Sequence, residues 1–193
     1  MQSNNNSTEE TQKTSPDYNS LRWNFKDSPD YTPYDIVITT DGSGYLDKIG
    51  GFGALILSSK YLELNGTTAY GCSNHTETGR AELYAIVHAL HATLEKLRGN
   101  SAWELENLRE THPTILVLSD RQDVVGKANK LFKRNVDLDL WQAYDYYETY
   151  FDIIVRHIPR DTLPIHKSVD ALASELRLVL LDFTETQKDA KHI

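Results

Sequence analysis

Hydrophobic and polar positions along the chain predict a group of strands followed by alternating strands and helices. β-Branched runs at 35–40 and 52–58 predict two adjacent strands. The segment 61–73 contains the pair Asn65-Gly66, which is typical of a hairpin turn, and predicts a third strand. We therefore expect these three strands to form an antiparallel meander.

The remainder of the chain alternates between helical and strand patterns. After Gly79, apolar residues recur at helical spacing at Leu83, Ile86, Val87, Leu90, Leu94 and Leu97. The apolar run 114–119 predicts a buried strand, followed by helices over about 124–132 and 140–151, a strand at 153–155 and a last helix over 172–180. This order predicts an α/β fold with a mixed five-stranded sheet, three antiparallel strands and then βαβα, flanked by helices, with one additional helix before the fifth strand.

Composition divides the chain into a domain and two tails. Residues 1–33 form an N-terminal tail that is expected to be disordered, because its first thirty residues are polar and poor in aliphatic side chains. Its Leu21, Trp23 and Phe25 either pack on the chain's own domain or dock on a protein partner. The domain is expected at 34–183, and residues 184–193 form a C-terminal tail.

Charge and cysteine content limit the classes of partner. With 20 basic and 28 acidic side chains the net charge is −8, so nucleic-acid binding requires a local basic patch or metal ions. The single Cys72 excludes an intramolecular disulfide and fits a reducing compartment. No apolar run reaches the ~18 residues that span a bilayer. We expect a soluble intracellular protein of the cytoplasm, nucleoid or nucleus that contacts no membrane.

Four acidic residues stand out because each lies near the end of a predicted element. Each also has a structural explanation. Asp41 begins the turn-like Asp-Gly-Ser-Gly, Glu82 could cap a helix at Gly79, Asp120 could be an N-cap, and Asp170 could complement a helix dipole in its first turn.

Taken together, the four acids predict a metal site. The first and fourth strands are expected to run parallel, which brings their ends to one rim of the sheet. Carboxylates gathered there repel one another unless hard divalent cations lie between them. We expect two Mg²⁺ ions, for which Mn²⁺ can substitute, in an arrangement that suits phosphodiester hydrolysis.

Six motifs occur in order along the chain: Thr40-Asp-Gly-Ser-Gly44, Gly51-Phe-Gly-Ala-Leu55, Gly79-Arg-Ala-Glu-Leu-Tyr-Ala-Ile86, Leu118-Ser-Asp-Arg-Gln122, Val136-Asp-Leu-Asp-Leu-Trp141 and Val169-Asp-Ala-Leu-Ala173. Together they resemble the type 1 ribonuclease H family over about residues 35–182. The resemblance implies the ribonuclease H-like fold and cleavage of the RNA strand of an RNA–DNA hybrid. It implies that Asp41, Glu82, Asp120 and Asp170 are catalytic metal ligands. It also implies substrate contacts by Gly42, Ser43, Asn74, Arg80 and Gln122.

The chain departs from the family pattern in three places. Thr78-Gly79 stands where the family often has an amide side chain, so recognition of the RNA 2′-hydroxyl is weaker or relies on backbone groups. The basic loop of bacterial members is shortened, which leaves a candidate phosphate patch at Lys127, Lys130, Lys133 and Arg134. The usual loop histidine falls near Arg160, and His166 or His157 are the available substitutes, with His166 taken as the catalytic candidate.

Three functions remain open from the sequence. The first is a metal-dependent endoribonuclease that acts on RNA–DNA hybrids and leaves 5′-phosphates. The second is a catalytically silent binding or structural module with the same fold in a larger nucleic-acid assembly. The third is another metal nuclease of this fold, such as an exonuclease or a resolvase. A comparison of substrates with and without magnesium separates them.

Overall fold

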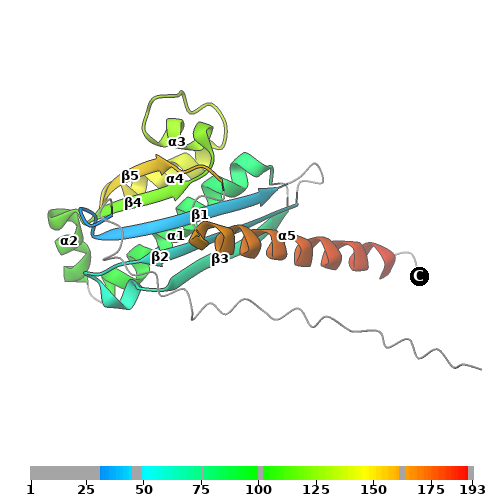
Figure 1. Cartoon of the computed structure of the whole chain (residues 1–193), viewed down its shortest axis with the longest axis horizontal. Coiled ribbons are helices and arrows are strands. Elements are labelled where there is room, and N and C mark those ends of the chain that lie inside the picture. The colour runs from blue at the N-terminus through cyan, green and yellow to red at the C-terminus, as the bar shows by residue number, and fades with distance from the viewer. Residues whose placement is uncertain (1–30, 45–48, 75, 100–101, 161–163, 191–193) are drawn as a thin grey trace, which may run out of the picture.

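A five-stranded mixed sheet forms the centre of the computed structural model, which describes residues 31–44, 49–74, 76–99, 102–160 and 164–190. Residues 1–30 of the tail 1–33 that was predicted to be disordered lie outside these residues. The strand order is β3-β2-β1-β4-β5, so β1 (Ile36–Gly44) occupies the middle of the sheet. Figure 1 shows the sheet with helices on both of its faces.

Strand directions follow the predicted order. β1 pairs antiparallel with β2 (Ile49–Leu57), which pairs antiparallel with β3 (Thr67–Asn74). On its other side β1 pairs parallel with β4 (Thr114–Ser119), and β4 pairs parallel with β5 (Asp152–His157). The predicted fold class is therefore confirmed.

One face of the sheet carries the main core beneath α1 (Thr78–Arg98). Ile36, Ile38, Ile115 and Val117 project from the strands into this core and are fully buried. The other helices that contribute side chains to it are α2 (Ala102–Thr111), α3 (Gln122–Ala128) and α4 (Leu138–Tyr147). Since burial of apolar surface is the main stabilising contribution, this core fixes α1 against β1.

The opposite face is covered by α5 (Pro164–Ala190), which packs on β1, β2 and β3. Two glycines of β2 allow this close packing: a Cβ at Gly51 would lie 2.1 Å from the Ala173 carbonyl oxygen, and one at Gly53 would lie 3.2 Å from that of Val169. In Figure 1 the C-terminal part of α5 extends beyond the sheet. The closeness of the first turns of α5 to β1 and β2 matters for the site.

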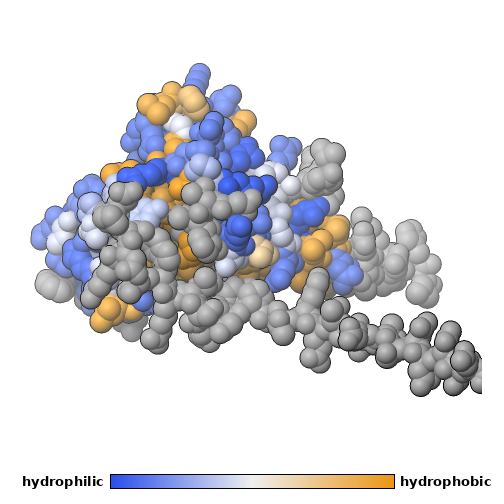
Figure 2. Space-filling view, in the orientation of Figure 1, coloured by the Kyte–Doolittle hydropathy of each residue, from blue (hydrophilic) through white to orange (hydrophobic). Residues whose placement is uncertain are grey.

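Several predicted boundaries were wrong. α2 was not predicted, and α3 ends at Ala128, so that Leu131 and Phe132 are exposed rather than helical. Figure 2 shows an apolar patch at the top of the molecule, over the segment that follows α3. Tyr31, assigned to the tail, is buried against β1 and β4, and α5 runs to Ala190 through most of the predicted C-terminal tail.

No helix among the described residues combines the length and the apolar character needed to cross a membrane.

Candidate metal centre

Asp41 lies within β1, opposite Gly53 of β2, and is fully buried. The turn interpretation of Asp41 was therefore wrong, because residues 41–44 continue the strand. Val37, four residues earlier on β1, packs on the side of the sheet away from the α1 core. Because alternate residues of a strand share a face, Asp41 points to that same side, toward α5.

Glu82 enters the site from α1 and is 1% exposed. Gly42 makes this possible, since a Cβ at Gly42 would lie 2.2 Å from the Glu82 backbone nitrogen. The N-cap position of the helix is Glu77 rather than Gly79, so Glu82 lies in the second turn and the capping interpretation was wrong. Glycine next to Asp41 thus allows the backbone of α1 to approach β1.

Asp120 directly follows β4, and its side chain is 9% exposed. Because β1 and β4 are parallel neighbours, Asp41 and Asp120 reach the same rim of the sheet. The N-cap residue of α3 is Arg121, whose backbone N–H donates to Ser119 Oγ. The capping interpretation of Asp120 was therefore wrong as well.

Asp170 comes from α5, with a side chain that is 42% exposed. The helix begins at Pro164, so Asp170 lies in its second turn and the first-turn interpretation was wrong. His166 lies one turn earlier on the same face and is 1% exposed. Its Nε2 is 3.8 Å from Asp41 Oδ1.

Arg160 forms a bridge between two of the acids. Its Nε lies 3.3 Å from Asp120 Oδ2, and its Nη2 lies 3.3 Å from Asp170 Oδ1. The Arg160 side chain is 65% exposed, so it can move away without disturbing a packed core. The sequence placed the family's loop histidine near this position but did not predict that an arginine would contact the carboxylates.

The protonation of the two most buried acids reflects their surroundings. Burial, followed by the negative charges of Asp170 and Asp120, raises the pKa of Asp41 to about 8. Burial, followed by the charges of Asp41 and Asp120, raises the pKa of Glu82 well above its usual range. Both carboxylates are therefore costly to ionise unless a cation is brought between them.

The carboxylate oxygens fit a hard divalent cation. Both oxygens of Asp41, Oε2 of Glu82 and Oδ1 of Asp120 are buried and accept no hydrogen bond from the described residues. One ligand atom each from Asp41, Asp120 and His166 lie within 4.8 Å of one another. Buried polar oxygens are normally satisfied, and metal coordination would satisfy these.

The predicted substrate contacts occupy different environments around this centre. Gly42 is buried between β1 and α1, and Ser43 is half-buried in β1. Asn74 and Gln122 are exposed, at the end of β3 and the start of α3. Arg80 is half-buried and forms ion pairs with Asp137, at 2.8 Å, and Asp139. Arg80 can therefore contact a substrate only if it leaves these two partners.

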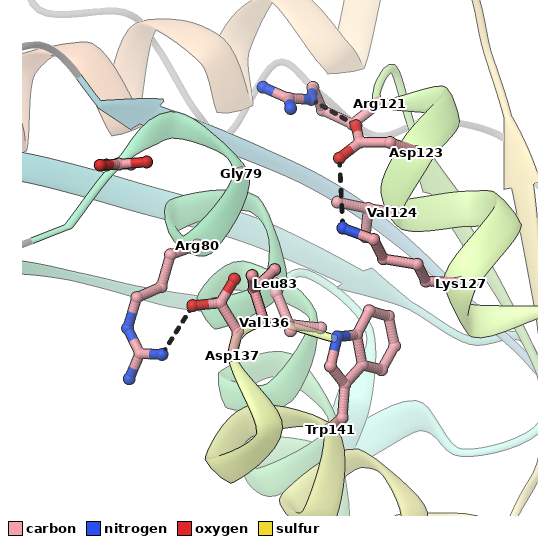
Figure 3. Close-up of a pocket in the computed structure, with 11 residues that line it drawn as sticks. Gly79, Arg80, Leu83, Arg121, Asp123, Val124, Lys127, Val136, Asp137 and Trp141 are labelled. Carbon is pink, nitrogen blue, oxygen red and sulfur yellow. Dashed lines mark hydrogen bonds and ion pairs between the residues drawn. The ribbon is translucent and has the colours of Figure 1, made fainter. Parts of the chain in front are cut away.

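A pocket of about 480 Å³ lies beside the centre, between the start of α1, α3 and the start of α4. Its lining combines charged side chains of both signs with the indole of Trp141 (Figure 3). Asp123 forms an ion pair with Arg121 at 2.9 Å and a second one with Lys127 at 3.7 Å. The pocket was not predicted, because its lining residues come from three separate segments.

The candidate phosphate patch is less basic than the sequence indicated. Three of its members pair with acids: Lys127 with Asp123, Lys130 with Glu148, and Arg134 with Asp145. Lys133 is exposed. Arg134 also lies over the Trp141 ring, 4.2 Å from its centroid. Most of the positive charge on this surface is thus neutralised within the chain.

His157 contacts the backbone of Asp120. Its Nε2 lies 3.1 Å from the Asp120 backbone oxygen, at hydrogen-bond distance, and the residue is half-buried at the end of β5. This contact ties the end of β5 to the segment that carries Asp120.

Solved ribonuclease H structures share this fold. The N-terminal RNase H domain of Rv2228c from Mycobacterium tuberculosis matches with a TM-score of 0.59 at 17% identity, over 77% of this chain and 97% of that chain. LC11-RNase H1, isolated from compost and solved with an RNA/DNA hybrid, matches at 0.59 and 18%, over 76% and 99%. RNase H1 of the archaeon Halobacterium salinarum matches at 0.54 and 21%, over 73% and 96%.

Comparison of the sequence with models of known families and with curated proteins finds no match. The structural matches nevertheless cover nearly the whole of each ribonuclease H domain. The chain therefore has the ribonuclease H fold, as the strand order also indicates.

Proposed function

We propose that this protein is a type 1 ribonuclease H that hydrolyses the RNA strand of RNA–DNA hybrids. The observation that carries the proposal is the pair Asp41 and Glu82, which are buried side by side with Asp120 and retain oxygens that no described residue satisfies. A domain of this fold gains nothing in stability from such a pair, because burial and mutual repulsion both oppose ionisation.

Asp41, Glu82, Asp120 and Asp170 would hold two divalent ions, Mg²⁺ or its substitute Mn²⁺. Bound there, the ions would activate water and stabilise the leaving oxygen of the phosphodiester. Arg160 has to leave Asp120 and Asp170 before both can serve as ligands, and its exposure allows that movement. Once released, its guanidinium lies at the mouth of the site, where it can bind a substrate phosphate.

Gln122, Ser43 and Asn74 would contact the hybrid around this centre, whereas Gly42 is buried and acts by letting α1 approach β1. LC11-RNase H1 was solved with an RNA/DNA hybrid, and this relative supports the choice of substrate. The neutralised basic surface at residues 127–134 predicts that binding relies more on the metal ions than on lysine contacts.

The test is a comparison of matched substrates of one sequence. The full chain is incubated with an RNA–DNA hybrid, duplex DNA and duplex RNA, each with Mg²⁺, with Mn²⁺ and with a chelator. The proposal predicts cleavage of the hybrid's RNA strand only when a divalent ion is present, with 5′-phosphate products. Cleavage in chelator, or of duplex DNA alone, would contradict it.

A silent module with the same fold is the second candidate. The ion pairs that occupy Arg80, Lys127, Lys130 and Arg134 favour it, since they reduce the surface available to phosphates. Hybrid binding without cleavage in either metal would select this function over the first.

A further inference from the structure

His166 lies inside the carboxylate cluster rather than at its edge. The imidazole is 1% exposed, with Nε2 at 3.8 Å from Asp41 Oδ1. Ligand atoms of His166, Asp41 and Asp120 all lie within 4.8 Å of one another. A nitrogen donor from α5 and two oxygen donors, one from β1 and one from the residue after β4, thus lie close together.

The fold holds His166 there from both sides. Ile165 and Val169 are buried on the same helix, 1% and 3% exposed, and anchor the first turns of α5 to the sheet. Gly53, which pairs with Asp41, leaves room for the Val169 carbonyl of α5. A larger residue at position 53 would move α5, and with it the imidazole, away from Asp41.

The separations suit ligands of one ion. In an octahedral site with bonds of about 2.0–2.1 Å, neighbouring ligand atoms lie about 3 Å apart and opposite ones about 4.2 Å. The observed 3.8 Å between His166 and Asp41 falls within that range. The limit of 4.8 Å for the set exceeds it by a few tenths of an ångström, which small side-chain rotations can close. Both oxygens of Asp41 are buried and accept no hydrogen bond from the described residues, so they are available to a cation.

We propose that His166 is a direct metal ligand, which gives one ion position mixed nitrogen and oxygen coordination. The inference rests on the proposed function for the presence of the ions. Imidazole suits transition metals better than Mg²⁺, and affinity for such a site rises from Mn²⁺ through Co²⁺. The site therefore binds Mn²⁺ and Co²⁺ in preference to Mg²⁺, and the His166 side chain sets that preference.

Replacing His166 with asparagine isolates the nitrogen ligand. Asparagine keeps an oxygen donor of similar reach, so Mg²⁺ affinity changes less than about threefold while Mn²⁺ affinity falls by about tenfold or more. His112→Asn is the matched control. His112 is half-buried, with a side chain that is 38% exposed, lies before β4, and has φ of 41°, a backbone conformation that asparagine tolerates.

The decisive measurement is pulsed electron paramagnetic resonance of Mn²⁺ bound to the full chain, which detects nitrogen nuclei directly bonded to the ion. We expect a nitrogen signal in the wild type and in His112→Asn, and its loss in His166→Asn. Calorimetric titration with Mn²⁺ and Mg²⁺ measures the affinities in parallel. A wild-type complex without the nitrogen signal, a signal that persists in His166→Asn, or the absence of Mn²⁺ binding would each overturn the proposal.

Hybrid cleavage is measured separately on the same samples. Failure to cleave while the nitrogen signal is present would refute the nuclease function and leave the ligand assignment intact. Cleavage with no nitrogen signal would refute the ligand assignment and leave the nuclease function intact.

Discussion

Asp41→Asn tests whether the buried carboxylate cluster destabilises the protein when no divalent ion is bound. Asparagine has nearly the same shape as aspartate but cannot ionise. Burial and the charges of Asp170 and Asp120 raise the pKa of Asp41 to about 8 in the folded chain. Between the ordinary pKa and that value the folded state keeps a proton that the unfolded state has released, so stability falls as the pH rises.

The gap between 3.8 and about 8 corresponds to roughly 6 kcal/mol if Asp41 titrated alone. Arg160 lowers this cost, and the neighbouring acids share it. We therefore expect the advantage of Asp41→Asn over the wild type to grow by about 2–3 kcal/mol between pH 5 and pH 8. For a chain of this size that corresponds to roughly 5–10 °C in melting temperature.

The assay is urea unfolding of both proteins in chelator at pH 5, 6, 7 and 8. Asp35→Asn is the control, because Asp35 accepts hydrogen bonds from the Thr114 backbone N–H at 3.0 Å and from Lys60 at 2.7 Å. Burial raises the pKa of Asp35, but these hydrogen bonds outweigh it, so the pKa lies below its usual value. This variant should lose about 1–2 kcal/mol at pH 7. A lower stability of Asp41→Asn than of the wild type at pH 8, or an advantage that does not change with pH, would refute the reasoning.

Three further predictions follow from single contacts. Arg160→Ala removes the cation that bridges two carboxylates, so the protein is less stable in chelator. In calorimetry, Mg²⁺ binds this variant up to about tenfold more tightly, because Arg160 no longer competes with the ion for the carboxylates. Unchanged Mg²⁺ affinity would contradict this prediction. Gly42→Ala costs about 3 kcal/mol or more in urea unfolding because its Cβ meets the α1 backbone at 2.2 Å, whereas Gly79→Ala meets only an arginine side chain at 3.4 Å and is tolerated. His157→Ala loses about 1 kcal/mol of stability with its contact to a backbone oxygen, while hybrid turnover changes less than about threefold.

The sheet could be predicted from the sequence because its strands carry strong local patterns. The run 114–119 was predicted to the residue, and Gly66, with φ of 79°, occupies the turn that the Asn65-Gly66 pair indicated. α2 was missed because its sequence, AWELENLRET, is mainly polar and Leu108 is its one residue buried in the core among those described. Helices that bury so little surface carry no clear periodicity.

The structure brings the four acids of the predicted site close together, and their role as metal ligands stays a prediction. Their local settings differ from those that the sequence indicated, because Asp41 continues a strand and Asp170 lies in the second turn of a helix. The ion pairs of Arg160 join it to residues 40 and 10 positions away, which no local pattern reveals. The same holds for Arg80, for which the family resemblance implied a substrate contact although the fold pairs it with Asp137 and Asp139.

The most direct test of the central claim is the rate at which the RNA strand of a hybrid is cleaved in Mg²⁺ by the wild type and by Glu82→Gln. Glutamine preserves the shape of a side chain that is 1% exposed and removes only its charge. We predict cleavage with 5′-phosphate ends by the wild type, and a loss of at least about a hundredfold in a variant that unfolds no earlier than its parent. Equal cleavage by the two proteins would contradict the account, because the buried carboxylates would then have no part in the reaction.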